Sequence, residues 1–269
     1  MADFEFGLNT STIRPADLRQ KIELAGEAGY DAIELWIDDV EKYIEGGGSL
    51  ADVRKWLDDQ GLKRPSMICL RDWCQADDQA FAKAFETAKR RLDIAGKLGV
   101  VRIVASPPRE KVSLAMATDR YGKILDQSIM QGVPASVEFL GFVEGINTLE
   151  DAWAICAGTG MAEATVTPDV WHIYRGGSNI ATLDDIPADH ISCFHWNDAP
   201  KEPPRLEQND SHRVYPGDGI VNLKEIADKL RKKDFQGCLT LELFNPSYWM
   251  QDPLEVAKTG LAKMKASVA

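Results

Sequence analysis

The sequence predicts an α/β protein that folds as a single (β/α)8 barrel. Eight short apolar runs follow one another at intervals of about 26 to 35 residues, except before the last run, and helix-like stretches separate them. The length of 269 residues also fits, because such a barrel typically needs about 250 residues. Since no stretch has the composition of a linker, we expect residues 1–269 to form one domain.

Each apolar run is interpreted as a β-strand, because short apolar runs bounded by turn residues are typical of buried strands in a parallel sheet. The strands of a parallel barrel end at the same mouth, which is where active sites lie. The eight predicted strands are residues 4–9, 31–36, 63–70, 100–105, 135–140, 164–169, 190–195 and 238–243.

The segments between the strands predict helices. Residues 15–28 begin with a proline and are followed by Gly29, and residues 77–97 also end near a glycine, as helices commonly do. The sixth helix must be short, because only residues 178–187 are available for it. The glycines at 46–48 are predicted to form a flexible turn between the second strand and its helix. The remaining predicted helices are residues 50–60, 113–131, 148–159, 223–233 and 253–266.

Composition and charge exclude several classes of function. Hydrophobic residues make up 44% of the chain and charged residues 27%, as in an ordinary globular protein with a large core. The net charge of −11 opposes binding to nucleic acid, which depends on attraction to phosphates. Because no segment resembles a signal peptide or a membrane span, we expect a cytoplasmic protein with no membrane partner.

The five cysteines form no CxxC pair, and we expect them to be reduced and structural. Cys74 is the possible exception. It follows Trp73 in a loop predicted at the mouth of the barrel, and Arg71 is the neighbouring cation that could lower the pKa of its thiol.

Four polar residues stand at the ends of four successive predicted strands: Glu138, Asp169, His195 and Glu242. Because these ends meet at one mouth, we expect the four side chains to converge. Three carboxylates and one imidazole suit one divalent metal ion, with Mn²⁺ as the first choice and Mg²⁺, Co²⁺ or Zn²⁺ as alternatives. The competing interpretation is that each carboxylate caps the following helix, which would explain any one of them alone.

Glu138 and Glu242 are predicted to be catalytic as well as metal-binding. Each could bind the ion through one carboxylate oxygen and exchange a proton with a substrate carbon through the other. The metal would polarise a carbonyl group and stabilise an enediolate. Two bases on two faces permit isomerisation or epimerisation of a keto-polyol or ketose, and a buried salt bridge is the alternative role of Glu242.

Other residues near the strand ends are predicted to bind the substrate. His172 follows Asp169 closely, and Arg213 lies in a glycine-containing loop that can reach the mouth; a packing role for His172 and a rim salt bridge for Arg213 are the alternatives. Asn197 is expected at the rim, where it contacts the substrate or orients a ligand. Five tryptophans at or just past predicted strand ends could pack against the apolar face of a sugar, with a packing role as the alternative for each, namely Trp36, Trp73, Trp171, Trp196 and Trp249. The loop after the eighth strand, FNPSYWM, lacks glycine, so an unphosphorylated polyol or sugar is the expected partner.

The segments VEFLG, PDxWH, HxND, RVYPGDGxVNL and LELFNP resemble the xylose-isomerase-like TIM-barrel superfamily of sugar isomerases and epimerases, over nearly the whole chain. Within it, GGSNIATL, RVYPGDG and ELFNPSYW are most similar to the inosose (2-keto-myo-inositol) isomerases of inositol catabolism. The resemblance implies metal binding by the four strand-end residues, proton transfer by the two glutamates, and contacts of His172 and Arg213 with substrate oxygens. Barrels of this kind often dimerise, so a homo-oligomer is possible.

Some positions depart from this pattern. Phe142 occupies a place that is often polar, TPD replaces the usual aliphatic pair before the ligand Asp169, and RGGSN after His172 is more basic than expected. The resemblance therefore leaves the substrate open between keto-polyols and 3-keto-glycosides. It also leaves open a dehydratase, which eliminates water after the same proton abstraction. A non-catalytic ligand-binding protein and an abasic-site endonuclease are the further alternatives, and the second would need more than four histidines and a basic surface.

Overall fold

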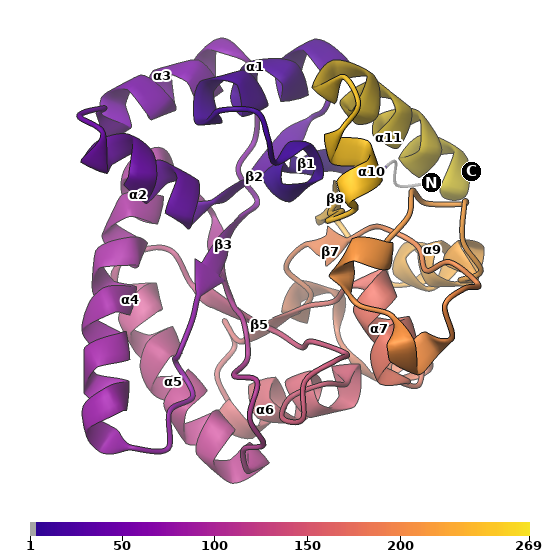
Figure 1. The fold of residues 1–269 in the computed structure, drawn as a ribbon. Helices are drawn as coiled ribbons and strands as arrows, with labels where there is room; N and C mark the ends of the chain where they lie inside the picture. The colour runs from indigo at the N-terminus through magenta and orange to yellow at the C-terminus, as the bar shows by residue number, and fades with distance from the viewer. Residues whose placement is uncertain (1–3) are drawn as a thin grey trace.

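Parallel strands run through the centre of the molecule, and helices surround them (Figure 1). The computed structural model describes residues 4–269, and within this range eight strands pair in the order β6-β5-β4-β3-β2-β1-β8-β7. This arrangement confirms the predicted (β/α)8 barrel. The strands are β1 (Glu5–Asn9), β2 (Ala32–Trp36), β3 (Ser66–Leu70), β4 (Arg102–Ala105), β5 (Ala135–Glu138), β6 (Thr165–Thr167), β7 (Phe194–His195) and β8 (Cys238–Leu241).

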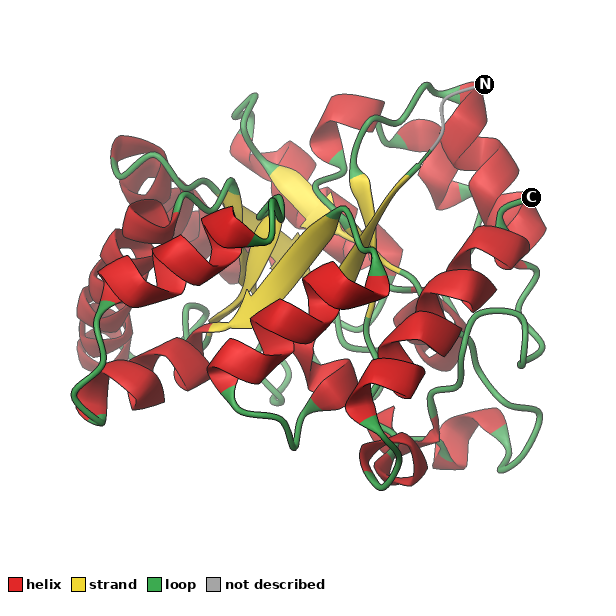
Figure 2. Ribbon diagram, turned by 90° about the horizontal axis from the view of Figure 1, so that it is seen from above, coloured by secondary structure: helices red, strands yellow, loops and turns green. Residues whose placement is uncertain are grey.

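The helices pack on the outside of the sheet (Figure 2), and their ends follow local sequence signals. Helix α1 begins at a capping box formed by Asp17 and Gln20 and ends at Gly29, whose φ of 87° favours glycine. The α-helices are α1 (Leu18–Ala28), α2 (Ile37–Glu45), α3 (Leu50–Asp59), α4 (Asp78–Leu98), α5 (Leu114–Met130), α6 (Leu149–Thr159), α7 (Val170–Gly176), α8 (Thr182–Asp185), α9 (Leu223–Lys232), α10 (Pro246–Trp249) and α11 (Pro253–Ser267). Short 3₁₀ helices are η1 (Thr10–Ile13), η2 (Ala188–His190), η3 (Arg205–Glu207) and η4 (Asp210–His212).

Three α-helices were not expected from the sequence, namely α2, α7 and the short α10 in the loop after β8. Helix α2 begins directly after β2, so the glycines at 46–48 join two helices instead of a strand and a helix. Helix α7 begins directly after Asp169, whose side chain accepts a hydrogen bond from the backbone N–H of His172 and thereby caps the helix. His172 therefore lies on the first turn of a helix, next to the strand ends.

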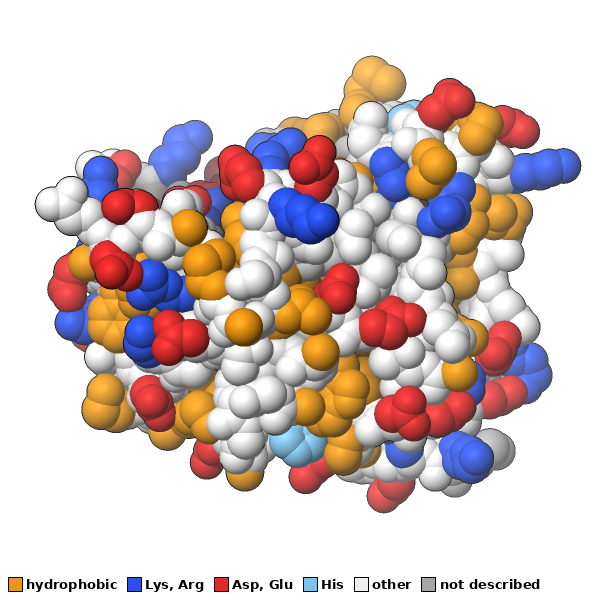
Figure 3. All heavy atoms as spheres, turned by 90° about the horizontal axis from the view of Figure 1, so that it is seen from below, with side chains coloured by type: hydrophobic (Ala, Val, Ile, Leu, Met, Phe, Trp, Pro, Cys, Tyr) orange, Lys and Arg blue, Asp and Glu red, His pale blue; other side chains and the backbone are white. Residues whose placement is uncertain are grey.

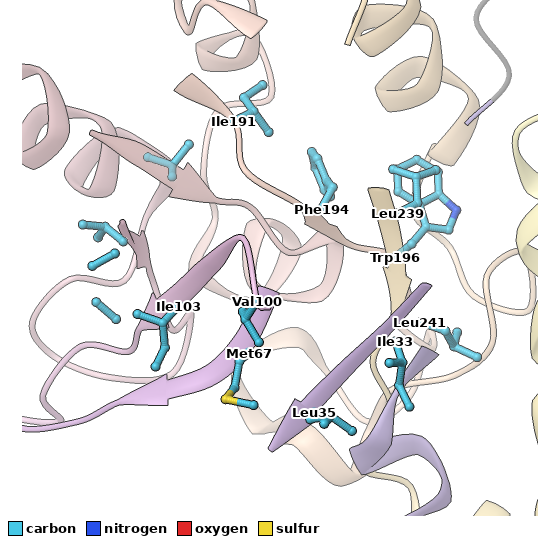
Figure 4. Close-up of a cluster of buried hydrophobic side chains, with 14 of the residues drawn as sticks. Ile33, Leu35, Met67, Val100, Ile103, Ile191, Phe194, Trp196, Leu239 and Leu241 are labelled. Atoms are coloured by element: carbon cyan, nitrogen blue, oxygen red, sulfur yellow. The ribbon is translucent and has the colours of Figure 1, made fainter. Parts of the chain in front are cut away.

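Side chains alternate along each strand between the helix layer and the barrel interior. In β2, Ile33 and Leu35 belong to the main hydrophobic core, whereas Glu34 between them contacts polar side chains from β1, β3 and β7. Figure 4 shows Ile33 and Leu35 in this core, together with Phe194 and Trp196. The barrel interior is thus partly polar, and this polar interior leads up to the mouth.

The ring of strands has one weak joint, between β6 and β7. These two strands stand at the two ends of the strand order. Within residues 4–269, the pairing across this joint consists of the isolated bridges Val166↔Ile191 and Asp169↔His195. Two of the predicted ligand residues therefore face each other directly across the joint.

The surface carries charges of both signs. On the face shown in Figure 3, acidic and basic side chains are interspersed with apolar ones. Among the helices of residues 4–269, none has the length and apolar character needed to cross a membrane.

Candidate active site

The four residues predicted to bind metal converge at the carboxyl ends of their strands. Glu138 ends β5, Asp169 follows β6, His195 ends β7 and Glu242 follows β8. The Nδ1 atom of the His195 ring lies 3.2 Å from an oxygen of Glu138, 3.2 Å from an oxygen of Glu242 and 3.6 Å from an oxygen of Asp169. Four side chains that are far apart in the sequence thus surround one small volume.

This donor set fits a divalent cation. The Nδ1 atom of His195 is buried and, among the described residues, has no hydrogen-bond partner, so its contacts with the carboxylates are close but wrongly angled for hydrogen bonds. Donor atoms that each lie about 2.1 Å from one ion are about 3.0–3.4 Å apart. The ligand atoms of Glu138, His195 and Glu242 all lie within 4.8 Å of one another, which is compatible with a shared ion after small side-chain movements.

Electrostatics also favour a positive charge here. Burial would lower the pKa of the His195 imidazole, but the charges of Glu242 and Glu34 outweigh burial and raise that pKa well above its ordinary value. Burial raises the pKa of the Glu138 carboxyl, and Glu242 adds to the shift, while His195 and Ser106 oppose it. A cluster of buried carboxylates that attracts a proton to the imidazole would equally attract a metal ion.

Arg213 joins two of these carboxylates. Its Nη1 atom lies 2.7 Å from an oxygen of Asp169 and 2.7 Å from an oxygen of Glu242, and Nη2 lies 2.6 Å from Asp210. The guanidinium also lies over the ring of Trp171, with its central carbon 5.1 Å from the ring centroid. The arginine is thus held between the carboxylates and an aromatic face, which makes it part of the site.

The loop that follows Arg213 is fixed by the buried carboxylate of Asp198. This carboxylate accepts hydrogen bonds from the backbone N–H groups of Gly217, Gly219 and Val221. A Cβ atom on Gly219 would lie 2.5 Å from the carboxyl carbon of Asp198, so a larger residue does not fit there. The glycines of RVYPGDG therefore allow the loop to close on Asp198 and to present Arg213.

His172 lies beside Arg213 with its ring buried. The N–H of Gly141 points at its Nδ1 atom at 3.1 Å, and Nη2 of Arg213 lies 2.9 Å from Nε2. Burial lowers the pKa of the His172 imidazole to about 3, and the charge of Arg213 contributes to the shift. With donors on both sides the ring is neutral at physiological pH.

The site opens into a cavity of about 420 Å³. Glu138, Glu242, His172 and Arg213 reach its wall, together with the aromatic rings of Trp36, Phe142 and Phe244. The Trp36 and Phe244 rings meet edge to face, with centroids 5.8 Å apart. Charged groups and apolar ring faces on one cavity are what a polyhydroxylated ring compound requires of a binding pocket.

Of the five predicted tryptophans, Trp36 lines this cavity, Trp249 donates to the backbone oxygen of Ser11, and the other three lie in the interior. Trp73 donates from Nε1 to the backbone oxygen of Ser106 at 2.8 Å, and Trp171 donates to Gln208 at 3.1 Å. Trp196 donates to Ser267 of α11 at 2.9 Å, so it points toward the helix layer. The sequence contained a signal for this orientation of Trp196. Side chains alternate along a strand, so the residue next to an inward-pointing His195 must point outward.

Asn197 is buried behind the predicted ligands. Its Nδ2 group donates to Asp169 at 3.0 Å and to the backbone oxygen of Glu242 at 3.3 Å, and its Oδ1 accepts from the N–H of Trp171 at 2.8 Å. In this position Asn197 orients Asp169, which is one of the two roles that the sequence suggested for it.

The sequence prediction missed Phe244 of the cavity wall and three polar residues that contact the predicted ligands. Glu34 contacts the Nε2 face of His195, Asn9 donates to both Glu34 and Glu242, and Ser106 donates to Glu138 at 2.7 Å. The signal for Glu34 was a lone charged residue inside the apolar strand DAIELW, because burying a carboxylate requires specific partners.

The structure places the Cys74 thiol in the interior. Burial raises its pKa to about 11, and the charge of Arg120, which acts in the opposite direction, does not offset this. The thiol is therefore protonated at neutral pH, which argues against the reactive cysteine considered from the sequence.

The fold and the site together define a (β/α)8-barrel protein with a candidate metal centre at the carboxyl ends of its strands. Residues 22–267 match the family model described as xylose isomerase-like TIM barrel, and the chain belongs to this family.

Individual relatives carry two kinds of name. The inosose isomerase of Bacillus velezensis is 26% identical over 268 residues, which cover 96% of this chain and 95% of that protein. The 3-dehydroshikimate dehydratase of Pseudomonas aeruginosa is 25% identical over 235 residues, which cover 86% of this chain and 37% of that protein. A crystal structure of IOLI protein with a binding zinc atom superposes with a TM-score of 0.92, at 24% sequence identity and 98% coverage of both chains.

Proposed function

We propose that this protein is a divalent-metal-dependent isomerase or epimerase of a keto-polyol, with an inosose as the first substrate to test. The observation that carries the proposal is the placement of Glu138 and Glu242. Both carboxylates reach the wall of the cavity, and both lie 3.2 Å from the unpartnered Nδ1 atom of His195. Two buried carboxylates beside one cation site can remove a proton from a substrate carbon and return it.

The proposed ligands of the metal are Glu138, Asp169, His195 and Glu242. When bound, a divalent cation would stabilise negative charge on the substrate oxygen next to the carbon that loses its proton. Mn²⁺ is our first choice because three of the four ligands are carboxylates, and the zinc bound by the IOLI protein keeps Zn²⁺ as a strong alternative.

The two glutamates are held differently, which suits two different tasks. Glu242 accepts from Asn9 at 3.1 Å and from Arg213 at 2.7 Å, so an amide and a guanidinium hold its carboxylate in place. Glu138 accepts from Ser106 at 2.7 Å, and its pKa is raised chiefly by burial. We propose that Glu242 removes the proton and that Glu138, whose raised pKa favours its protonated form, delivers one.

Arg213 and His172 are proposed to bind substrate oxygens. Both reach the cavity wall beside Glu242. The neutral His172 ring can donate or accept a hydrogen bond, and Arg213 can stabilise an oxyanion. The aromatic rings of Trp36 and Phe244 would cover the apolar face of the substrate ring.

A dehydratase acting on a keto-polyol is the second candidate function. The relative named 3-dehydroshikimate dehydratase covers 86% of this chain. Elimination of water begins with removal of the same kind of proton, so the glutamates described above would serve both reactions.

The experiment is an NMR assay in D₂O with 2-keto-myo-inositol, using the Mn²⁺-loaded protein and the same protein stripped of metal. Deuterium uptake beside the carbonyl with formation of an isomeric keto-inositol, in the loaded sample alone, is the expected result. A dehydrated product would assign the protein to the lyases. Absence of exchange with inososes, ketoses and 3-keto-glycosides would contradict the proposal.

A further inference from the structure

We propose that Glu34 is a positioning residue that fixes the His195 ring for metal binding. This inference rests on the metal site of the proposed function. It concerns the side of the ring that faces away from the other three ligands, and it assigns a role to a buried carboxylate that takes no part in the proton transfer proposed above.

Glu34 lies on β2 with its side chain fully buried, at 0% exposure. The Nε2 atom of His195 lies 3.1 Å from one of its oxygens and 3.3 Å from the other. The Nδ1 atom, on the other side of the ring, faces Glu138, Asp169 and Glu242. The imidazole therefore lies between the Glu34 carboxylate on its Nε2 side and the three other carboxylates on its Nδ1 side.

A neutral imidazole has one N–H group and one lone pair. Carboxylates face both nitrogens, but Nε2 forms a hydrogen bond with Glu34, whereas Nδ1 forms none with the carboxylates around it. The hydrogen of a metal-bound, neutral ring therefore belongs on Nε2 and the lone pair on Nδ1. This tautomer is the one that a cation between the three carboxylates needs. Glu34 thus determines which nitrogen is available, and it prevents the ring from turning over.

Glu34 is itself held in place by donors. Asn9 donates from Nδ2 at 2.5 Å, and Ser66 donates from its hydroxyl group. The amide of Asn9 cannot turn over, because its Oδ1 accepts from the indole N–H of Trp36 at 2.9 Å and from the backbone N–H of Ser11 at 2.9 Å. The orientation of Glu34 is therefore set by three strands, β1, β2 and β3, before any metal binds.

A competing interpretation is a second metal site, because Glu34, Cys193 and His195 also place donor atoms within 4.8 Å of one another. The hydrogen bonds argue for positioning instead. Both oxygens of Glu34 are already engaged by donors, and Cys193 lies 3.6 Å from the carboxylate in donor geometry. Positioning requires one ion per chain, whereas the competing interpretation requires two.

The first measurement is a Zn²⁺ titration of the metal-stripped full chain against a competing chelator. Glu34→Gln keeps the side-chain volume but adds a donor where the neighbours are donors, and we expect its affinity for Zn²⁺ to fall about 10–100-fold. Glu41→Gln is the matched control, since Glu41 is a largely buried glutamate paired with Arg91 outside the site, and its affinity should be unchanged. Urea unfolding of each metal-free variant shows how much of the protein is folded.

The second measurement reads the tautomer directly. The chain has four histidines, so ¹⁵N labelling of histidine gives a simple ring spectrum. In the Zn²⁺-loaded wild type we expect His195 to carry hydrogen on Nε2 and metal on Nδ1. In Glu34→Gln we expect a mixture of tautomers or loss of the metal-bound signal.

Three results would overturn the proposal: unchanged affinity and ring spectrum in Glu34→Gln, two ions per wild-type chain, or an affinity loss no larger than the loss of folded protein. These results differ from a failure of the proposed function. A wild type that binds no divalent ion would overturn both, whereas a wild type that binds one ion while Glu34→Gln binds it equally well overturns the positioning role alone.

Discussion

Arg213 and Asp169 form a buried ion pair, in which Nη1 of the guanidinium lies 2.7 Å from Oδ2 of the carboxylate and the side chains are 1% and 0% exposed. Burial by itself would raise the pKa of the Asp169 carboxyl, but Arg213, together with His172 and His195, holds that pKa below its ordinary value. The same guanidinium contacts Glu242 at 2.7 Å. The chain therefore supplies a cation of its own to a cluster of acids that would otherwise repel one another.

Arg213→Met should destabilise the metal-free protein. Removal of one partner leaves buried carboxylates without compensation, and the expected loss is about 3–5 kcal/mol of the free energy of unfolding. Urea denaturation of metal-stripped samples measures it. Arg19→Met is the control, because its pair with Glu23 is exposed to solvent and should contribute little to stability. Equal losses in the two variants would show that Arg213 does not hold the acidic cluster together.

Glu242→Gln should reduce kcat about 10²–10⁴-fold with little change in fold, because the amide has nearly the same volume but cannot take a proton from carbon. The NMR assay gives the rate, and circular dichroism gives the fold. Glu23→Gln, at an exposed position on α1, is the control and should turn over normally. Near-normal turnover in Glu242→Gln would remove Glu242 as a base.

Removal of metal should abolish turnover and also lower the melting temperature. A ligand that binds the folded chain stabilises it, by about 2.7 kcal/mol at a free concentration of 100 times Kd. Thermal melts and activity assays on chelated protein, with and without added Mn²⁺, test both effects. Full activity in a sample shown by elemental analysis to contain no metal would contradict the mechanism.

The cysteines should be unreactive in the folded protein. All five are free and buried, and burial raises the pKa of the Cys69 and Cys74 thiols to about 11. Because the thiolate is the reactive form, a thiol reagent at pH 7.5 should label none in the native state and five after unfolding in guanidinium. Rapid labelling of Cys74 in the native protein would restore the idea of a reactive thiol at the mouth.

The strands and most helices could be predicted because their signals are local. Apolar runs mark the strands, and residues such as Asp17 and Gly29 mark helix ends. Helix α7 was not predicted, because its seven residues follow the strand directly and are too few to show a clear helical period. Helix α2 was hidden in the same way, since Trp36 ends β2 and also precedes the first turn of the helix.

The candidate site was predictable only in part. A polar residue at the end of an apolar run can be recognised along the chain, which is how Glu138 and Glu242 were selected. Glu34 carries a local signal, as a charged residue inside an apolar run, but its role and that of Asn9 depend on contacts across three strands that no local pattern records. Trp73 and Trp171 were placed wrongly at the pocket wall, because sequence does not show whether a large ring at a strand end turns toward solvent or toward the core.

The weak joint between β6 and β7 implies a structural role for the candidate metal ion. The two strands meet there through isolated bridges, one of which joins Asp169 to His195. A single ion bound by both side chains would hold the two end strands of the sheet together and so stabilise the closed barrel. Loss of the ion would then first cause local opening between β6 and β7. A shortage of metal would therefore expose the protein to proteolysis at this joint, while the opposite side of the barrel stayed closed.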